Sequence, residues 1–289
     1  MNDGAPIAVL GLGAMGSRMA QNLLADGLPV RVWNRSEGAT KPLADAGASV
    51  ARTPREAAEG AAIVLACVRD DDAARAVWLH PETGAAAGLA EGTLAIESST
   101  LTPGAVRELA GALAPARFVE APVVGSRPQA EQRALVHLVG ASEADFDAAK
   151  PLLARLGKAA QHVGAPGQGA VMKLVVNAYF ATQTAAMGEL LGFAAKAGVG
   201  AERAAEILGA LPITSPALKG LAGLMVKGAY APLFPVELVA KDLRYAEAAA
   251  VAVGATLPTA GGARAAFEAA IDAGDGGLNI QGVAKQFLG

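Results

Sequence analysis

A glycine motif near the start of the chain constrains the fold more than any other feature of the sequence. The segment GLGAMG spaces Gly11, Gly13 and Gly16 as G-x-G-x-x-G, after the apolar run PIAVL and at the start of a segment with helical character. Such glycines permit a tight turn, close approach of a pyrophosphate to the backbone, and close helix–strand packing. N–H groups at the start of the helix favour phosphate. We therefore expect a dinucleotide-binding loop, the alternative being a glycine-rich turn without a ligand. The expected loop residues are Gly11, Leu12, Gly13, Ala14, Met15 and Gly16.

Alternating apolar runs and helical segments predict the fold class. AMGSRMAQNLLADG indicates a helix that ends at Gly27, and the segments expected as strands are PIAVLGLG, PVRVWNRS, AAIVLACVRD, GTLAIESST, RFVEAPVVGS and ALVHLVG. Strands that are apolar on both faces indicate a largely parallel sheet covered by helices. After about residue 165 the chain reads as long Ala- and Leu-rich helices. We expect an α/β fold, with a Rossmann-type dinucleotide-binding domain over residues 1–165 and an all-helical domain over residues 166–289.

Charge and composition exclude several classes of function. The formal net charge is -3, and Lys and Arg are scattered singly, so we expect no nucleic-acid partner. Cys67 is the only cysteine and the three histidines are far apart in sequence, which argues against a disulfide framework and a metal site. The sequence shows neither a charged leader nor an apolar run of the roughly 20 residues that a spanning helix needs. We expect a metal-free cytoplasmic protein that does not bind membranes.

The end of the second predicted strand indicates the choice of cofactor. An acidic residue there would hold the ribose 2′-hydroxyl of NAD, but this strand ends in Asn34, Arg35 and Ser36. An arginine can pair with a 2′-phosphate, which an acid would repel. We therefore expect NADP(H), with NAD(H) as the alternative if Arg35 is only a surface residue. Val68 and Thr100 follow later strands and are expected as walls of the cofactor cleft, although Ser99 and Thr100 could instead cap the next helix.

A lysine and an asparagine stand in an otherwise apolar segment, GQGAVMKLVVNAYF. In a helix Lys173 and Asn177 would lie one turn apart on the same face. Taken alone, the pair indicates a lysine that reaches water along its own methylenes and a solvated amide. The segment falls where the two predicted domains meet, however, and ligand sites are common at domain junctions.

Four segments together resemble a known family. They are IAVLGLGAMGSRMAQNLLADG, EAPVVGS, GQGAVMKLVVN and FPVELVAKDLRYA, and in order and spacing they are similar to the signature segments of the beta-hydroxyacid dehydrogenase family. The resemblance spans nearly the whole chain. It implies a Rossmann domain joined by one long helix to an all-helical domain. The sequences of the EAPVVGS and WNRS segments resemble the glyoxylate/succinic semialdehyde reductase branch more than the hydroxyisobutyrate branch. The latter more often has D-A-P-V-S-G-G in place of EAPVVGS.

The resemblance also implies roles for individual residues. Lys173 matches the catalytic lysine and Asn177 the amide one turn further along. The positions that match the family's cofactor and substrate contacts are Lys241 and Asp242 near the nicotinamide and substrate, Phe234 in the substrate pocket, and Gly125 and Ser126 at the substrate carboxylate.

This sequence departs from the family pattern at Val124, where a serine is usual. The change removes a hydroxyl that would face the substrate carboxylate, and the loss of a donor weakens selection for such acids. The usual G-T-L that follows is Arg133, Ala134 and Leu135 here. The substrate is therefore open among glyoxylate, succinic semialdehyde, tartronate semialdehyde, methylmalonate semialdehyde and a bulkier or less acidic carbonyl.

The expected chemistry is hydride transfer to an aldehyde. Negative charge develops on the carbonyl oxygen, where the Lys173 ammonium could stabilise it and donate a proton, with Asn177 orienting the groups. Burial would favour the neutral lysine needed in the oxidising direction. Three alternatives are a 3-hydroxyisobutyrate or tartronate semialdehyde dehydrogenase, an imine reductase, whose family usually has Asp or Tyr at the position of Lys173, and an NADP-binding sensor without activity. The resemblance also implies a homodimer or homotetramer.

Overall fold

The computed structural model describes residues 4–288, which form two compact units. Of these residues, those up to Lys173 belong to the first unit and those from Leu174 onward to the second. The long helix α8 (Gln168–Lys196) begins in the first unit and continues in the second. The predicted fold class is confirmed: a Rossmann-type α/β domain is followed by an all-helical C-terminal part, and one long helix joins them.

The first unit is built on a nine-stranded sheet with the order β3-β2-β1-β4-β5-β6-β8-β7, and β9 pairs with β8. The strands from β3 to β6 are mutually parallel, whereas β8 is antiparallel to β6 and β7. The strands are β1 (Ile7–Leu10), β2 (Val30–Trp33), β3 (Ser49–Val50), β4 (Ile63–Ala66), β5 (Leu94–Glu97), β6 (Arg117–Glu120), β7 (Val123–Val124), β8 (Leu135–Gly140) and β9 (Gly157–Gly164). The chain order reverses beside β1, the position at which sheets of this kind bind ligands.

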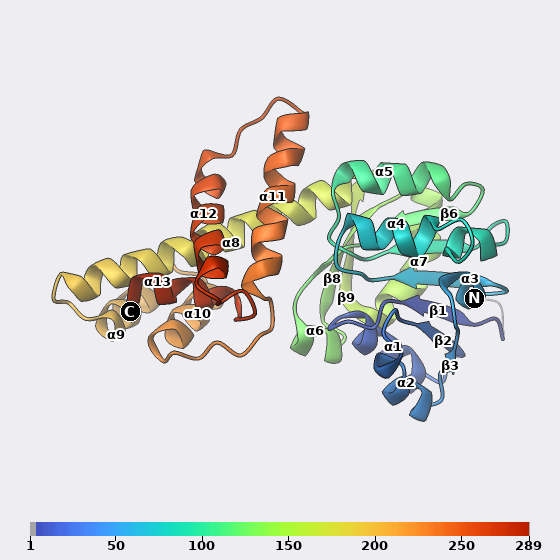
Figure 1. The fold of residues 1–289 in the computed structure, drawn as a ribbon, viewed down its shortest axis with the longest axis horizontal. Coiled ribbons are helices and arrows are strands. Elements are labelled where there is room, and N and C mark those ends of the chain that lie inside the picture. Colours follow the sequence, from blue (N-terminus) through green and yellow to red (C-terminus); the bar gives the residue numbers. More distant parts are fainter. Residues whose placement is uncertain (1–3, 289) are drawn as a thin grey trace. The chain divides into compact units, whose positions relative to one another are not determined.

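Helices cover both faces of this sheet (Figure 1). Successive residues of a strand point to opposite faces, so Ile7 and Val9 pack in one core and Ala8 and Leu10 in the other. The first core contains apolar residues of α1 (Gly16–Ala25), α2 (Lys41–Asp45), α6 (Arg127–Glu131) and α7 (Glu143–Leu156). The second contains residues of α3 (Pro54–Ala58), α4 (Asp71–Leu79) and α5 (Pro103–Ala112). Strands buried on both faces explain the continuous apolar runs in the sequence.

Two strands lack a sequence pattern that would predict them. β9 has the sequence GKAAQHVG, and most of its residues are half-buried or exposed. It exists because its backbone pairs with β8 from Leu135 to Gly140. β3 has only two residues and pairs with β2. The segment predicted as one strand, RFVEAPVVGS, forms the two strands β6 and β7, which Ala121 and Pro122 separate.

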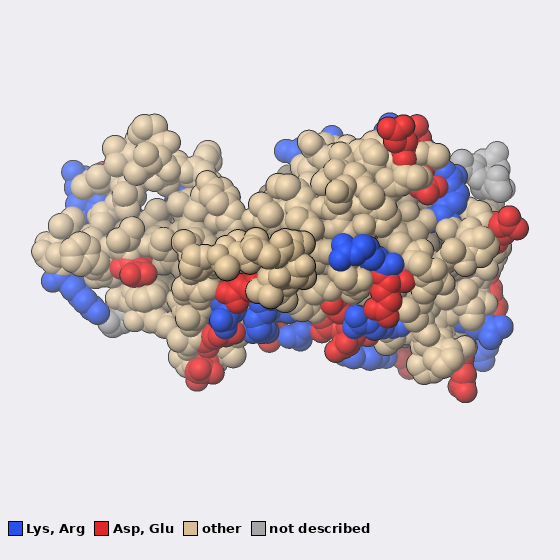
Figure 2. All heavy atoms as spheres, turned by 90° about the horizontal axis from the view of Figure 1, so that it is seen from above, with Lys and Arg blue, Asp and Glu red and all other residues tan. Residues whose placement is uncertain are grey.

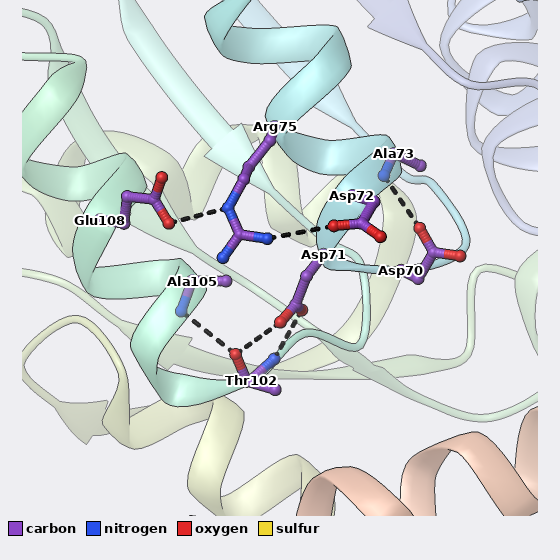
Figure 3. A network of polar contacts seen from close by, with 8 residues as sticks. All are labelled: Asp70, Asp71, Asp72, Ala73, Arg75, Thr102, Ala105 and Glu108. Carbon is purple, nitrogen blue, oxygen red and sulfur yellow. Dashed lines mark hydrogen bonds and ion pairs between the residues drawn. The ribbon is translucent and has the colours of Figure 1, made fainter.

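Helices α4 and α5 are tied together by polar contacts close to the carboxyl ends of β4 and β5 (Figure 3). The carboxylate of Asp71 accepts hydrogen bonds from the backbone N–H of Thr102 at 2.9 Å and from its hydroxyl at 2.6 Å. Thr102 in turn caps α5 by accepting from the N–H of Ala105 at 3.2 Å. Arg75 pairs with Glu108 at 2.9 Å. The cap of α5 is therefore Thr102, and the alternative that Ser99 or Thr100 caps this helix is wrong.

The second unit contains helices packed around two apolar clusters. Apart from α8 these helices are α9 (Ala201–Ala210), α10 (Pro216–Val226), α11 (Val236–Ala252), α12 (Pro258–Asp272), the 3-10 turn η3 (Ile280–Ala284) and α13 (Lys285–Leu288). Side chains of α8 contribute to both clusters, and other large apolar side chains of this helix are exposed. Among residues 4–288, no helix is both long and apolar enough to cross a membrane.

The imidazole of His137 lies in the core of the first unit. His137 is 0% exposed in β8, and burial lowers its pKa from 6.5 to about 4. Between these two pH values the unfolded chain binds a proton that the folded chain does not, so stability falls as the pH falls from 6.5 to 4. The shift corresponds to a loss of up to about 3 kcal/mol in the free energy of unfolding.

We expect His137→Gln to flatten this part of the pH dependence. Urea unfolding followed by tryptophan fluorescence measures the first unit, since Trp33 and Trp78 both lie in it. The difference between wild type and variant should shrink as the pH falls from 6.5 to 4. The same change at His80, which is exposed, is the control. A difference that is constant with pH would contradict the prediction.

Candidate functional site

Two of the three glycines in the glycine loop stand at positions where a larger residue would not fit. Gly11 has φ +89°, and a Cβ there would collide with the carbonyl oxygen of Cys67. A Cβ on Gly16 would collide with the carbonyl oxygen of Gly11, so the start of α1 packs directly on the end of β1. Gly13, in contrast, faces open space. The first and third glycines therefore serve packing, and the second leaves the backbone accessible, as a pyrophosphate site requires.

The start of helix α1 suits an anion. Its N-cap residue, Met15, makes no side-chain capping bond, and the first turn contains no acidic residue. The hydroxyl of Ser17 donates to the carbonyl of Gly13 at 2.7 Å. The positive end of the helix dipole and its backbone N–H groups are thus not neutralised by a carboxylate of the chain, which fits a bound phosphate.

The segment Asn34, Arg35 and Ser36 follows β2 directly. The side-chain oxygen of Asn34 accepts from the N–H of Leu12 at 2.9 Å, and its amide nitrogen donates to the carbonyl of Ser36 at 3.0 Å. Asn34 thereby braces the glycine loop against the end of β2. Arg35 is exposed beside it, so its guanidinium is accessible to a ligand.

Buried polar groups hold the ends of β4 and β5 together. The N–H of Val68 donates to the hydroxyl oxygen of Ser99 at 2.7 Å, and the N–H of Ser99 donates to the Glu97 carboxylate at 2.7 Å. The indole N–H of Trp78 donates to the second oxygen of Glu97, also at 2.7 Å. Burial raises the pKa of Glu97 above its usual value. The backbone beside Val68, a predicted wall of the cofactor cleft, is therefore rigidly supported. Glu97 carries this support, and the sequence analysis did not identify it.

Lys173 exerts its charge at the carboxyl end of β4. Burial and the Glu97 carboxylate raise the pKa of the Cys67 thiol to about 12, and the Lys173 ammonium acts in the opposite direction. Lys173 itself is buried. β4 lies beside β1 and parallel to it, so the carboxyl ends of both strands are on the same side of the sheet. The lysine therefore lies on the side of the sheet where the glycine loop follows β1. The first unit therefore brings together the loop, the Val68 segment and the lysine.

The predicted substrate segment follows β7. Val124 is half-buried and pairs with Val136 of β8. Gly125 has φ +127°, and a Cβ there would lie 2.9 Å from Leu135. Ser126 is the N-cap residue of α6, and its N–H donates to the side-chain oxygen of Gln129 at 2.9 Å.

The loop after α6 is anchored by Arg133. This residue has φ +55°, and its guanidinium donates to the Asp26 carboxylate at 2.7 Å and to the carbonyl of Asn22 at 3.0 Å. Arg155 also binds Asp26, and the side-chain hydrogen bonds from these two arginines lower the pKa of Asp26. The departure from G-T-L thus replaces a glycine at a left-handed position with a residue that ties the loop to the end of α1.

In the second unit a buried polar cluster joins α8 to α11. The amide of Asn177 donates to the Asp242 carboxylate at 2.6 Å, and the Lys241 ammonium lies 3.1 Å from the other oxygen of Asp242. The Lys241 ammonium also lies 4.7 Å from the centre of the Tyr245 ring. Asn177 and Asp242 are buried, so their short hydrogen bond fixes both side chains. The cluster joins Asn177 to the pair Lys241 and Asp242, which the sequence placed in a different segment.

Phe234 owes its position to Asn279, a residue that the sequence analysis did not select. The side-chain oxygen of Asn279 accepts from the N–H of Leu233 at 3.0 Å and from the N–H of Phe234 at 2.7 Å. Its amide nitrogen donates to Gln281. Both Asn279 and Gln281 are buried, although these residue types are usually exposed, and no local pattern in the sequence marks them.

Other surface features do not coincide with the predicted site residues. A shallow hollow beside α3 contains two ion pairs and is lined by Arg52, Thr53, Arg55, Glu56 and Glu59. Within residues 4–288, no group of three or more His, Cys, Asp or Glu side chains could hold a metal ion. On the face shown in Figure 2, basic and acidic side chains lie interspersed.

The known proteins that this chain resembles include dehydrogenases and reductases that use nicotinamide cofactors. Residues 6–164 match the model for the NAD-binding domain of 6-phosphogluconate dehydrogenase, and residues 167–287 match the model for the NAD-binding part of NADP-dependent 3-hydroxyisobutyrate dehydrogenase. Glyoxylate/succinic semialdehyde reductase 1 of Arabidopsis thaliana is 34% identical over 279 residues, 96% of either chain. Mitochondrial 3-hydroxyisobutyrate dehydrogenase of Drosophila melanogaster is 31% identical, over 93% of this chain and 85% of that one. The structure of a 3-hydroxyisobutyrate dehydrogenase from Salmonella typhimurium superposes with a TM-score of 0.87 at 27% identity, covering 98% of this chain and all of that one.

Proposed function

Because the chain belongs to the beta-hydroxyacid dehydrogenase family, and is thus an NAD(P)-dependent oxidoreductase acting on CH–OH groups, we propose that it is an NADPH-dependent reductase. Its substrate is a small aldehyde acid of the glyoxylate or succinic semialdehyde type, and the product is the hydroxy acid. The observation that carries the proposal is a buried lysine near the carboxyl ends of β1 and β4, where the glycine loop also lies. The similarity to a glyoxylate/succinic semialdehyde reductase supports the substrate class.

Lys173 is the proposed general acid. The reduced nicotinamide, when bound, supplies the hydride to the carbonyl carbon. The Lys173 ammonium hydrogen-bonds the carbonyl oxygen, stabilises the negative charge that develops on it, and donates the proton that completes the hydroxyl group. Since the lysine is buried, these interactions act in an environment that screens charge weakly. In the reverse direction the neutral amine accepts the same proton.

Asn177 lies one turn after Lys173 on α8 and has the proposed role of orienting the reacting groups. Its bond to Asp242 fixes the amide, and Lys241 balances the charge of that carboxylate. Lys241 is a proposed cofactor contact, and Asp242 and Phe234 are proposed substrate contacts. Gly125 and Ser126 are proposed to hold the substrate carboxylate with backbone and hydroxyl groups.

The proposed cofactor is NADP(H), with NAD(H) as the alternative. Gly13 leaves room for the pyrophosphate, and the uncapped start of α1 supplies N–H groups. Arg35 is exposed beside Asn34 and Ser36, where a 2′-phosphate would find a positive charge. Val68 and Thr100 are the proposed walls of the cofactor cleft.

We also propose a cytoplasmic homodimer or homotetramer. Helix α8 exposes large apolar side chains at Val175, Tyr179, Leu190 and Phe193. Exposed apolar residues at such spacing along one helix support contact with a second copy of the chain. Sedimentation analysis would measure the assembly.

The test of the function is a set of initial rates of NADPH and NADH oxidation with short aldehyde acids. We expect turnover of glyoxylate or succinic semialdehyde with NADPH. Val124→Ser should raise kcat/KM for these acids about tenfold, because it restores a hydroxyl donor for the carboxylate. Val124→Ala, which removes bulk without adding a donor, is the matched control. Turnover of cyclic imines without turnover of any aldehyde would contradict the proposal.

A further inference from the structure

A buried carboxylate lies at the start of the helix that carries Lys173. Glu120, the last residue of β6, is 0% exposed. Its Oε1 accepts hydrogen bonds from the backbone N–H groups of Gly167 and Gly169, both at 2.7 Å, and its Oε2 accepts from the N–H of Ala170 at 3.1 Å. The first N–H groups of a helix have no partners within the helix. One side chain, about 50 residues away in sequence, thus satisfies three of these donors at the start of α8.

The surrounding chain is shaped to accommodate this carboxylate. A Cβ on Gly140 would collide with Glu120, and a Cβ on Gly169 would lie 3.0 Å from Oε1 and 2.6 Å from the carbonyl oxygen of Leu138. Gly167 has φ +96°, a conformation that favours glycine. The first turn of α8 therefore packs against both the backbone of β8 and the Glu120 carboxylate. This close packing leaves the helix little freedom to shift or rotate.

The carboxylate form of Glu120 makes these contacts. Burial raises the pKa of Glu120 to about 7, and the three N–H groups and Arg107 act in the opposite direction. Negative charge at this end of the helix also interacts favourably with the helix dipole. Above pH 7 the side chain is therefore an acceptor at both oxygens, and it can receive all three hydrogen bonds.

We propose that Glu120 is a positioning residue for Lys173. By capping α8 from the end of β6, it fixes the position of the lysine side chain near the carboxyl ends of the parallel strands. Lys173 follows Ala170 by three residues, so the side chain leaves the helix one turn after the capped N–H groups. A displaced first turn would move the lysine directly. The inference rests on the proposed function, in which the lysine is the general acid, and small displacements of a catalytic group can cost about a hundredfold in rate.

The variant Glu120→Gln tests the inference with little change in shape. The glutamine oxygen can accept two hydrogen bonds, but its NH₂ group faces one backbone donor, so one bond is lost and two donors oppose each other. At pH 8 we expect kcat to fall by about ten- to a hundredfold, with the KM for NADPH changed less than threefold. Glu120→Asp retains a carboxylate and should lose less activity than Glu120→Gln.

Asp145→Asn is the matched control for a general loss of stability. Asp145 lies on α7 and pairs at 2.6 Å with Arg117, the first residue of β6, so this carboxylate-to-amide change affects a contact at the opposite end of the strand that ends in Glu120. We expect this variant to keep its kcat. An equal loss of kcat in Asp145→Asn and Glu120→Gln would overturn a positioning role.

Hydrogen exchange supplies a readout that does not depend on activity. In Glu120→Gln the backbone amides of residues 167–173 should exchange at least about tenfold faster than in the wild type, whereas those of α1 should not change. Unchanged exchange in this segment would overturn the inference whatever the kinetics. If the wild type shows no turnover that depends on Lys173, the proposed function fails, and the exchange result alone decides whether Glu120 holds the helix.

Discussion

Replacing Lys173 with methionine is expected to lower kcat by about a thousandfold while the protein still binds NADPH. Methionine keeps an unbranched apolar side chain, one atom shorter than that of lysine, but has neither the charge nor the proton. General acid catalysis and electrostatic stabilisation of a developing oxyanion each contribute about a hundredfold or more to such reactions. Because Lys173 is buried, water cannot readily replace its ammonium. The measurement is the initial rate of NADPH oxidation with glyoxylate and succinic semialdehyde, together with NADPH affinity from quenching of tryptophan fluorescence.

Two further variants define what a loss of rate in Lys173→Met means. Lys173→Arg retains a positive charge but holds its proton too strongly to act as an acid, so it should recover only the electrostatic part. Lys196→Met changes an exposed lysine in the last turn of the same helix and should leave kcat unchanged. If Lys173→Met keeps its kcat within about tenfold of the wild type, the lysine is not the general acid.

Replacing Arg35 with aspartate is expected to reverse the choice of cofactor. The change removes a cation from the proposed 2′-phosphate site and adds an acid that can bind a ribose 2′-hydroxyl. We expect the ratio of kcat/KM for NADPH to that for NADH to fall at least about a hundredfold, since a charged hydrogen bond is lost and a repulsion is introduced. Most of the change should lie in the KM for NADPH, because Arg35 is remote from the hydride in this mechanism.

The same charge change at another exposed arginine controls for net charge. Arg203 lies on α9 in the second unit, and Arg203→Asp should leave the cofactor ratio unchanged. Arg35→Gln should fall between wild type and Arg35→Asp, since it removes the attraction without the repulsion. A cofactor ratio that does not change in Arg35→Asp would show that the preference is determined elsewhere.

Much of the fold of the first unit follows from patterns of short range. The spacing of Gly11, Gly13 and Gly16 predicted a turn between strand and helix, and the structure has β1 and α1 at this place. The continuous apolar runs predicted strands buried on both faces, which β1 and β4 are. β9 was not predicted because all but one of its residues are small or polar, and it is a strand because its backbone pairs with β8.

For the predicted site residues, too, the sequence indicated what depends on near neighbours and not what depends on residues distant in the chain. Lys173 and Asn177 could be placed on one helical face from their spacing, because helix geometry depends only on neighbours in sequence. The bond between Asn177 and Asp242 joins residues 65 positions apart, and the support of Phe234 by Asn279 spans 45 positions. No local pattern specifies such pairs, so their partners could not be derived before the chain was folded.

By itself, then, the sequence determined the class of fold, the glycine loop and the helix that carries the lysine. These features depend on backbone conformation and on apolar periodicity, which a few neighbouring residues specify. The tertiary structure decided which buried polar groups meet. It brought Glu120 to the first N–H groups of α8, Glu97 to the hydrogen-bonded support of Val68, and Asp26 to Arg133. A buried carboxylate is stable only where donors surround it, and those donors come from segments that are distant in sequence.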